Sequence, residues 1–264
     1  MNYRPGPVAV SLAALIGVFL LLPLLAVVPI SFTPMRFLSI PTGAWSLRHY
    51  RELLDNPDWG DALILSLRIG VISSALSTLL GLLFSLGIWM LRPPFAAALV
   101  GFVLLPMVAP PVVSAITLYF LLTTLSGALG IGYDSWQGVV LAHTVMTVPF
   151  AVVLLLVALA EVDPRLDLAA RGLGASLWMR AVHIVLPNIR FGIISAALLC
   201  FILSWDEIGV TLFITSVNAV TLPRLMWMGL RDNIDPAVAA LSVVLIGITV
   251  AVLALRAAVH AVRA

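Results

Sequence analysis

Two adjacent acidic residues, Asp206 and Glu207, stand inside an otherwise apolar stretch of the chain. A charged side chain near the centre of a membrane costs at least about 3 kcal/mol, so such residues usually face a cavity or a partner. Neighbouring residues on a helix point about 100° apart, so one partner can hardly serve both acids. We expect these acids, with the adjacent Trp205, to line a path for a solute, and an unpaired acid there would favour a cation.

Arg68 gives these acids a second possible role. It stands at a similar depth in its own apolar segment, so it could either line the same path or neutralise one acid in a structural ion pair. The two roles are not exclusive. His143, close to Thr147 and Pro149, could relay protons, but a hydrogen bond to a neighbouring helix is the favoured interpretation. No second His, Cys or carboxylate near it has metal-ligand spacing, so we predict no metal site.

The composition assigns the chain to the membrane proteins. Hydrophobic residues make up 62% of its 264 residues and charged residues only 10%, whereas soluble domains carry about 25% charged residues. Its mean hydropathy is +1.16. The chain contains no Lys, and its arginines are scattered between apolar runs, which argues against a nucleic-acid-binding face. Cys200 is the only cysteine, so no disulfide framework is possible.

Six apolar runs are long enough to cross a membrane as helices, which needs about 20 residues each. Helices are expected because unpaired backbone groups cannot face lipid. The first run is longer than the hydrophobic region of a signal peptide, which has about 7–15 residues, and reads as an uncleaved span. We therefore predict a single transmembrane domain over residues 1–264. The predicted spans are residues 8–30, 62–91, 95–122, 138–159, 192–213 and 237–259.

The arginines predict how the spans are oriented. If both termini lie on one side, the opposite loops carry only five arginines, several of them offset by acids. The positive-inside rule then places both termini in the cytoplasm, together with the polar segment between the fourth and fifth spans. The arginines on that side are Arg4, Arg92, Arg165, Arg171, Arg180, Arg190, Arg256 and Arg263.

That polar segment, residues 161–190, predicts a short helical elbow. Asp163 can cap a helix that begins with Pro164, because Asp is a good N-cap and proline suits the first helical turn. Gly172 and Gly174 should break this helix, and Ser176 can cap a second one. Two short helices at an angle form a knob that can enter a cleft on a soluble partner. On these residues alone, an amphipathic loop on the membrane surface is an equal alternative.

The elbow resembles the EAA loop of the membrane subunits of bacterial ABC importers. That pattern is Glu-Ala-Ala, a Gly four residues later, and Ile-x-Leu-Pro at the end. Leu168 occupies the Glu position here, and the nearest acid, Asp167, is one residue early. By this resemblance, the residues of the ATPase-coupling loop are Asp167, Leu168, Ala169, Ala170, Gly174, Ala175, Ile184, Leu186 and Pro187.

The resemblance extends over nearly the whole chain and is nearest to the spermidine/putrescine permease branch. Its landmarks here include Trp45-Ser46-Leu47 with Tyr50, His143-Thr144 with Pro149, Ser204-Trp205-Asp206-Glu207 and Thr221-Leu222-Pro223. It implies an all-α polytopic membrane protein with six transmembrane helices and the type I (MetI-like) ABC importer permease fold. It also implies a bacterial inner-membrane location, a cytoplasmic ABC ATPase dimer, an extracytoplasmic solute-binding protein and a second permease subunit, expected to be a homologue in a heterodimer.

These observations predict a transport subunit rather than an enzyme. Without Lys the chain has no Gly-x-x-x-x-Gly-Lys phosphate loop, so we expect no bound cofactor and ATP on a partner subunit. The resemblance favours a polyamine or similar organic cation as solute, with opine-like compounds, phosphonates and other small organic solutes as alternatives. An intramembrane enzyme has less support because no nucleophile elbow organises His143 and the acids. An ion-coupled carrier would typically show an internal repeat, and none is found.

Overall fold

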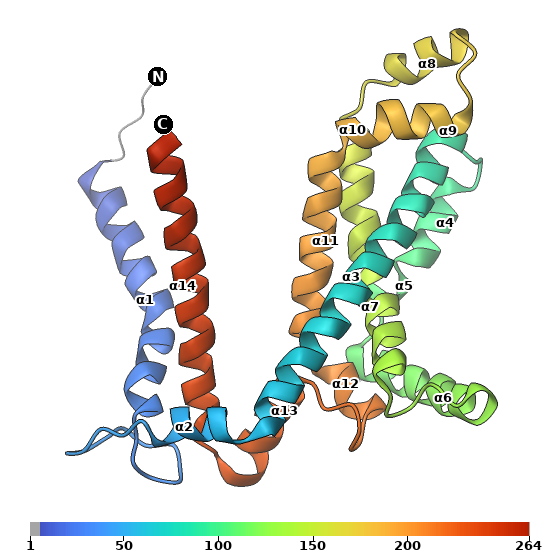
Figure 1. Ribbon diagram of the computed structural model, residues 1–264. Coiled ribbons are helices and arrows are strands. Elements are labelled where there is room, and N and C mark those ends of the chain that lie inside the picture. The colour runs from blue at the N-terminus through green and yellow to red at the C-terminus, as the bar shows by residue number, and fades with distance from the viewer. Residues whose placement is uncertain (1–5, 264) are drawn as a thin grey trace. The chain divides into compact units, whose positions relative to one another are not determined.

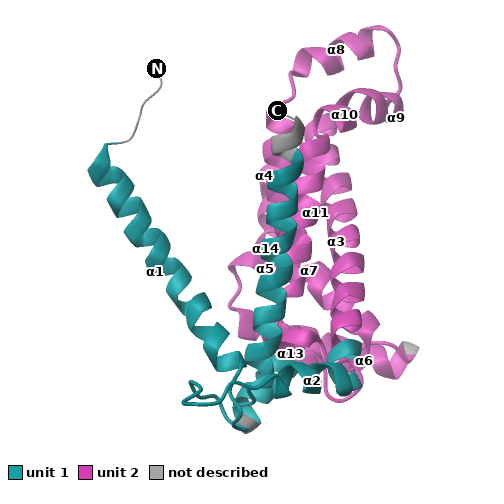
Figure 2. Ribbon diagram, turned by 60° about the vertical axis from the view of Figure 1, so that its left-hand side comes forward, with its two compact units in different colours: residues 1–61, 225–264 teal, residues 62–224 magenta. Residues whose placement is uncertain are grey.

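The computed structural model describes residues 6–263, and all the regular elements in this part of the chain are helices. The chain divides into two compact units, one formed by residues 1–61 with 225–264 and the other by residues 62–224 (Figure 2). Arg4, one of the arginines behind the predicted orientation, lies outside the described residues.

In the first unit, α1 (Pro7–Ser31) packs against α14 (Ala237–Arg263), and α2 (Arg48–Asp55) contacts α14 near the opposite end from the two termini (Figure 1). The helix α1 begins with a proline at its first position, where the missing N–H costs no intrahelical bond. The apolar window of α1 has a mean hydropathy of 2.7, and none of it is buried within the protein. A helix that is apolar all round and left uncovered suits a lipid environment.

An aromatic corner fixes the loop between α1 and α2. The ring of Phe32 lies 5.6 Å from that of Trp45 and 5.3 Å from that of Tyr50. The Tyr50 hydroxyl is 2.7 Å from the Ser31 Oγ, and the buried His49 ring hydrogen-bonds the Met35 carbonyl at 2.9 Å. Tyr50 and His49 both belong to α2, so these contacts tie the start of α2 to the loop before it.

The second unit is built around α7 (Trp136–Ala160), whose apolar window is 56% buried. This helix packs against α11 (Arg190–Trp205) and against α3 (Pro57–Leu91), most of which belongs to this unit. The contact with α3 is close because Gly81 faces Ala151: a Cβ placed on Gly81 would lie 2.8 Å from the Ala151 Cβ. Small residues at such crossings let two backbones approach within a membrane.

The predicted third span, residues 95–122, does not form a single helix. Instead the chain forms α4 (Ala96–Val103), α5 (Leu105–Val108) and, after a break at Ala109 and Pro110, α6 (Pro111–Leu129). The reason is local, because Pro110 and Pro111 lack the N–H groups that would continue the helix and their rings disfavour it. Helix α6 packs with α12 (Gly209–Ile214) at one end of the unit, and its Pro111–Ala128 portion is long and apolar enough to span (Figure 1).

At the opposite end of the unit lie α8 (Pro164–Gly172), α9 (Leu177–Arg180), a π-helical turn and α10 (Leu186–Asn188) (Figure 1). The helical segment 177–188 meets α11 at a bend of 75°. Within residues 6–263, five helices are long and apolar enough to cross a membrane, or six if this bent pair counts as one span. Pro187 lies in α10, before the bend, and α11 begins at Arg190.

Candidate functional site

The elbow forms as its local sequence predicts. The Asp163 carboxylate accepts the backbone N–H of Arg165 at 2.9 Å and caps α8. Helix α8 ends at Gly172, and Gly174 adopts a left-handed conformation with φ +80°, which costs glycine little. The Ser176 Oγ then accepts the N–H of Met179 at 3.3 Å and caps the next helix.

A buried ion pair joins the two arms of the elbow. Nη1 of Arg180 donates to both carboxylate oxygens of Asp167, at 2.7 and 2.8 Å. Arg180 is 5% exposed and Asp167 is 8% exposed, although most residues of the surrounding elbow are solvent-accessible in this chain. This pairing could not be predicted from the sequence, because the two residues lie on separate helices 13 positions apart.

The outer face of the elbow is apolar and uncovered. Leu173 is 89% exposed, Trp178 74% and Leu168 60%. Of the other motif residues, Ala170 is buried against the turn, while Ala169, Gly174 and Pro187 are exposed and Ala175, Ile184 and Leu186 are half-buried. A cluster of large exposed apolar side chains is typical of a surface that binds a partner.

The base of the elbow is anchored in the helical core. Val185 and Ile189 are buried in a cluster with Leu159 and Val162 from the end of α7. Leu86 and Trp89 of α3 pack against the same cluster. A displacement of the elbow is therefore transmitted to the ends of α3 and α7, because close-packed interiors transmit strain.

The two acids of the fifth apolar segment lie at a helix break, so residues 192–213 do not form one continuous helix. Helix α11 ends at Trp205, and α12 begins at Gly209. The Glu207 carboxylate accepts the N–H of Val210 at 2.8 Å. A side chain that caps the backbone in this way offers it an alternative to a continuing helix.

The break separates the environments of the two acids. Asp206 is exposed, whereas Glu207 is half-buried and lines a cavity of about 210 Å³. The interruption between α5 and α6 forms part of the cavity wall. The other residues that line it are Pro106, Met107, Ala109, Pro111, His143, Met146, Thr147, Phe150 and Leu203.

His143 is a buried hydrogen-bonding hub beside this cavity. One ring nitrogen lies 2.8 Å from the Ser204 Oγ of α11, and the other lies 2.9 Å from the Thr211 Oγ1 of α12. Thr211 in turn donates to the Glu207 carbonyl at 3.0 Å. The favoured prediction for His143, a hydrogen bond to a neighbouring helix, is confirmed.

Arg68 does not pair with either acid. Its guanidinium stacks over the Trp136 ring, with Cζ 3.7 Å from the ring centroid. None of the ion pairs among residues 6–263 joins Arg68 to Asp206 or Glu207, so the structural pair considered from the sequence is not observed. Trp205 stacks on Phe201 of its own helix, with centroids 6.0 Å apart.

Asp134, which the sequence did not single out, joins two loops of the second unit. Its carboxylate accepts backbone N–H groups of Ser216, Val217, Asn218 and Ala219, and also the Asn218 side chain. Burial alone would raise the pKa of Asp134, but these backbone donors lower it below its usual value. Its left-handed backbone, φ +53°, is one that Asp tolerates better than most residues.

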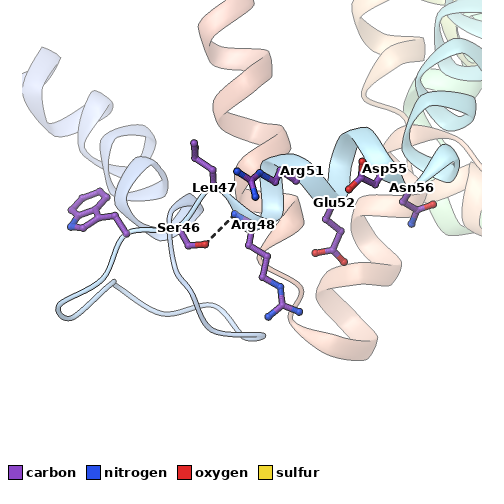
Figure 3. A pocket seen from close by; sticks show the side chains of 8 residues that line it. Ser46, Leu47, Arg48, Arg51, Glu52, Asp55 and Asn56 are labelled. Atoms are coloured by element: carbon purple, nitrogen blue, oxygen red, sulfur yellow. Dashed lines mark hydrogen bonds between the residues drawn. The ribbon is translucent and has the colours of Figure 1, made fainter.

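The first unit has a separate cavity of about 740 Å³ beside α2 (Figure 3). The segment that begins at Trp45 lines it together with two cations and two acids of α2, which are Arg48, Arg51, Glu52 and Asp55. Among the described residues, no group of three His, Cys, Asp or Glu side chains could hold a metal ion.

Residues 77–263 match the family described as binding-protein-dependent transport system inner membrane component. The chain is 31% identical over 235 residues to the putrescine transport system permease protein PotI of Escherichia coli K12, covering 87% of this chain and 82% of that protein. It is 35% identical over 192 residues to the molybdenum transport system permease protein ModB of the same organism, covering 66% and 81%. A bacterial ABC transporter that imports the acidic polysaccharide alginate has a chain of similar fold, with a TM-score of 0.68, 16% identity and coverage of 97% and 94%.

Proposed function

The chain belongs to the family of binding-protein-dependent transport system inner membrane components, and we propose that it forms half of a translocation path for a polyamine or similar organic cation. Membership makes it the permease subunit of an ABC importer in the spermidine/putrescine-like branch, and not an enzyme. The predicted all-α polytopic permease fold is confirmed.

The environment of Glu207 carries the solute proposal. Glu207 is the only Asp, Glu or Arg among the described residues that line its cavity, and none of the ion pairs within residues 6–263 involves it. One carboxylate oxygen already caps α12, and the group remains an acceptor for an ammonium donor. Phe150 and two methionines complete the wall, and aromatic faces attract cations. An oxyanion such as a phosphonate would meet this acid with no Arg among the described residues of the cavity wall.

The energy for import must enter through a partner. A chain without Lys cannot supply the lysine of an ATP-binding phosphate loop, so the nucleotide belongs to an ATPase subunit. We place the contact on the exposed apolar face of the elbow, formed by Leu168, Leu173 and Trp178. The arginine distribution supports a cytoplasmic elbow and cytoplasmic termini. The outer side then receives a solute-binding protein, and a homologous permease completes the path.

The solute proposal is tested by uptake of labelled putrescine and spermidine into proteoliposomes that hold the complete transporter. Glu207→Gln should lower uptake about tenfold or more, because hydrogen bonds to charged groups contribute about 1.5–3 kcal/mol. Asp206→Asn is compared alongside, and Asp55→Asn, exposed on α2, is the control. Unchanged uptake in both Glu207→Gln and Asp206→Asn would exclude an acid-lined cation path.

Docking of the ATPase is tested by co-purification. Leu173→Asp should abolish capture of the ATPase, because it places a charge in an apolar contact. Gly172→Ala is the matched control, since an added Cβ there meets nothing within 4 Å and the backbone is helical. ATPase capture that survives Leu173→Asp and Trp178→Asp would contradict docking through this face.

A further inference from the structure

The acid of the coupling loop is engaged inside the elbow. Both oxygens of Asp167 contact Nη1 of Arg180, at 2.7 and 2.8 Å, and both side chains are nearly fully buried. The neighbouring Nε of Arg180 is buried without a hydrogen-bond partner among the described residues. Among the described residues, the Asp167 carboxylate is therefore the counter-charge of this guanidinium, and a buried charge whose partner is removed is strongly destabilising.

Few other interactions hold α8 to the helix that follows it. Only Asp167 and Ala170 of its nine residues are buried. The backbone N–H of Ala175 bonds the Ala170 carbonyl at 3.0 Å within the turn. The Asp167–Arg180 pair is the only side-chain hydrogen bond between α8 and the segment 177–188 in the described residues. Without it, the turn around Gly174 would be free to act as a hinge.

The position of Asp167 in the sequence explains why Leu168 faces outward. Adjacent residues on a helix point about 100° apart, so when Asp167 faces Arg180 its neighbour cannot. Leu168 is 60% exposed as a result. The outward-facing residue is thus the uncharged Leu168, and the charged Asp167 faces the inside of the elbow.

We propose that the Asp167–Arg180 pair locks the two arms of the elbow, so that α8 and the segment 177–188 move as one body when the ATPase closes. Asp167 and Arg180 are positioning residues: they do not touch the ATPase, and they keep α8 from pivoting about Gly174. Movement of the outer face then reaches Val185 and Ile189, and through them the ends of α3 and α7. This role in transmission rests on the proposed docking of the elbow on the ATPase.

The lock itself is measured without the ATPase. Spin labels on Leu166→Cys and His183→Cys, both at exposed positions, report the separation of the two arms in the purified permease complex. The native Cys200 is fully buried and stays unlabelled. One narrow distance distribution is expected in the parent protein. It should broaden in Asp167→Asn and Arg180→Gln, and narrow again in the charge-swapped Asp167→Arg/Arg180→Asp variant. The exposed Arg171→Gln on the same helix is the control.

Transmission is measured as ATP hydrolysed per solute imported by the complete transporter in proteoliposomes. Asp167→Asn and Arg180→Gln should still co-purify with the ATPase but consume about tenfold more ATP per solute, and the charge swap should restore most of the coupling. A merely structural role would lower assembly and both activities together. The proposal would be overturned if the spin-label distances in Asp167→Asn and Arg180→Gln equalled those of the parent protein. It would also be overturned if the distances broadened but the ATP hydrolysed per solute did not change. Failure of docking is seen separately, in the Leu173→Asp co-purification.

Discussion

The carboxylate of Asp134 accepts the backbone N–H of Ser216 at 2.7 Å, joining residues 82 positions apart in the chain. Three further N–H groups, from Val217 to Ala219, bind the same carboxylate. The loop between α6 and α7 is thereby tied to the loop after α12, beside the helices that flank the Glu207 cavity.

This arrangement predicts a loss of stability in acid. The pKa of Asp134 is lowered in the folded protein, so its contribution is present above the unfolded pKa of about 3.9 and is lost as the pH falls through the lower folded value. Thermal unfolding of the purified protein should show a steeper decline below about pH 4 than in Asp134→Asn. At pH 7, Asp134→Ala should cost about 1–3 kcal/mol. Identical pH profiles for parent and Asp134→Asn would contradict this role, and Asp55→Asn is the control.

The crossing of α3 and α7 should not tolerate a methyl group. Gly81→Ala would place its Cβ 2.8 Å from the Ala151 Cβ, so the helices must separate, at a cost of about 1–3 kcal/mol. Gly87→Ala on the same helix meets nothing within 4 Å and should be neutral or slightly stabilising. The double variant Gly81→Ala/Ala151→Gly should recover most of the loss in thermal-shift measurements. Equal melting temperatures for Gly81→Ala and Gly87→Ala would show that the crossing is not tight.

His143 should contribute to stability through its hydrogen bonds to the hydroxyls of Ser204 and Thr211. His143→Leu removes the hydrogen bond between His143 and the buried Ser204 hydroxyl and should lower stability by about 1–3 kcal/mol. The triple variant His143→Leu/Ser204→Ala/Thr211→Val removes the polar partners together and should be less destabilised than the single one. A proton relay predicts the opposite pattern, with stability unchanged and uptake losing its pH dependence. Chemical-denaturation and uptake profiles of both variants distinguish the two.

Arg68 should be coupled energetically to Trp136 and not to the acids. A double-mutant cycle of Arg68→Gln and Trp136→Leu should give a coupling of about 0.5–2 kcal/mol, as expected for a cation over an aromatic face. The charge swap Arg68→Asp/Asp206→Arg should not recover the stability lost in Arg68→Asp. Recovery in that swap would restore the ion-pair interpretation that the geometry contradicts.

The sequence by itself determined the features set by local chemistry. The caps at Asp163 and Ser176 and the turn at Gly174 involve residues within a few positions of one another, and each was predicted from residue type and spacing. The high proportion of apolar residues likewise determined that this is a membrane protein. A chain of this length cannot bury so many apolar helices inside itself, so they must face lipid. The EAA spacing identified the kind of transporter.

The tertiary structure alone decided which distant groups meet. The break at Asp206–Glu207 was missed because hydropathy averages over a window and does not register that one carboxylate caps the next helix. Asp167 forms an ion pair with Arg180 across a turn, and Arg68 stacks on Trp136 of another helix. Asp134 accepts hydrogen bonds from the loop after α12. These pairings depend on how helices separated by many residues are placed side by side. Periodicity and propensity describe a single segment and carry no information about that placement.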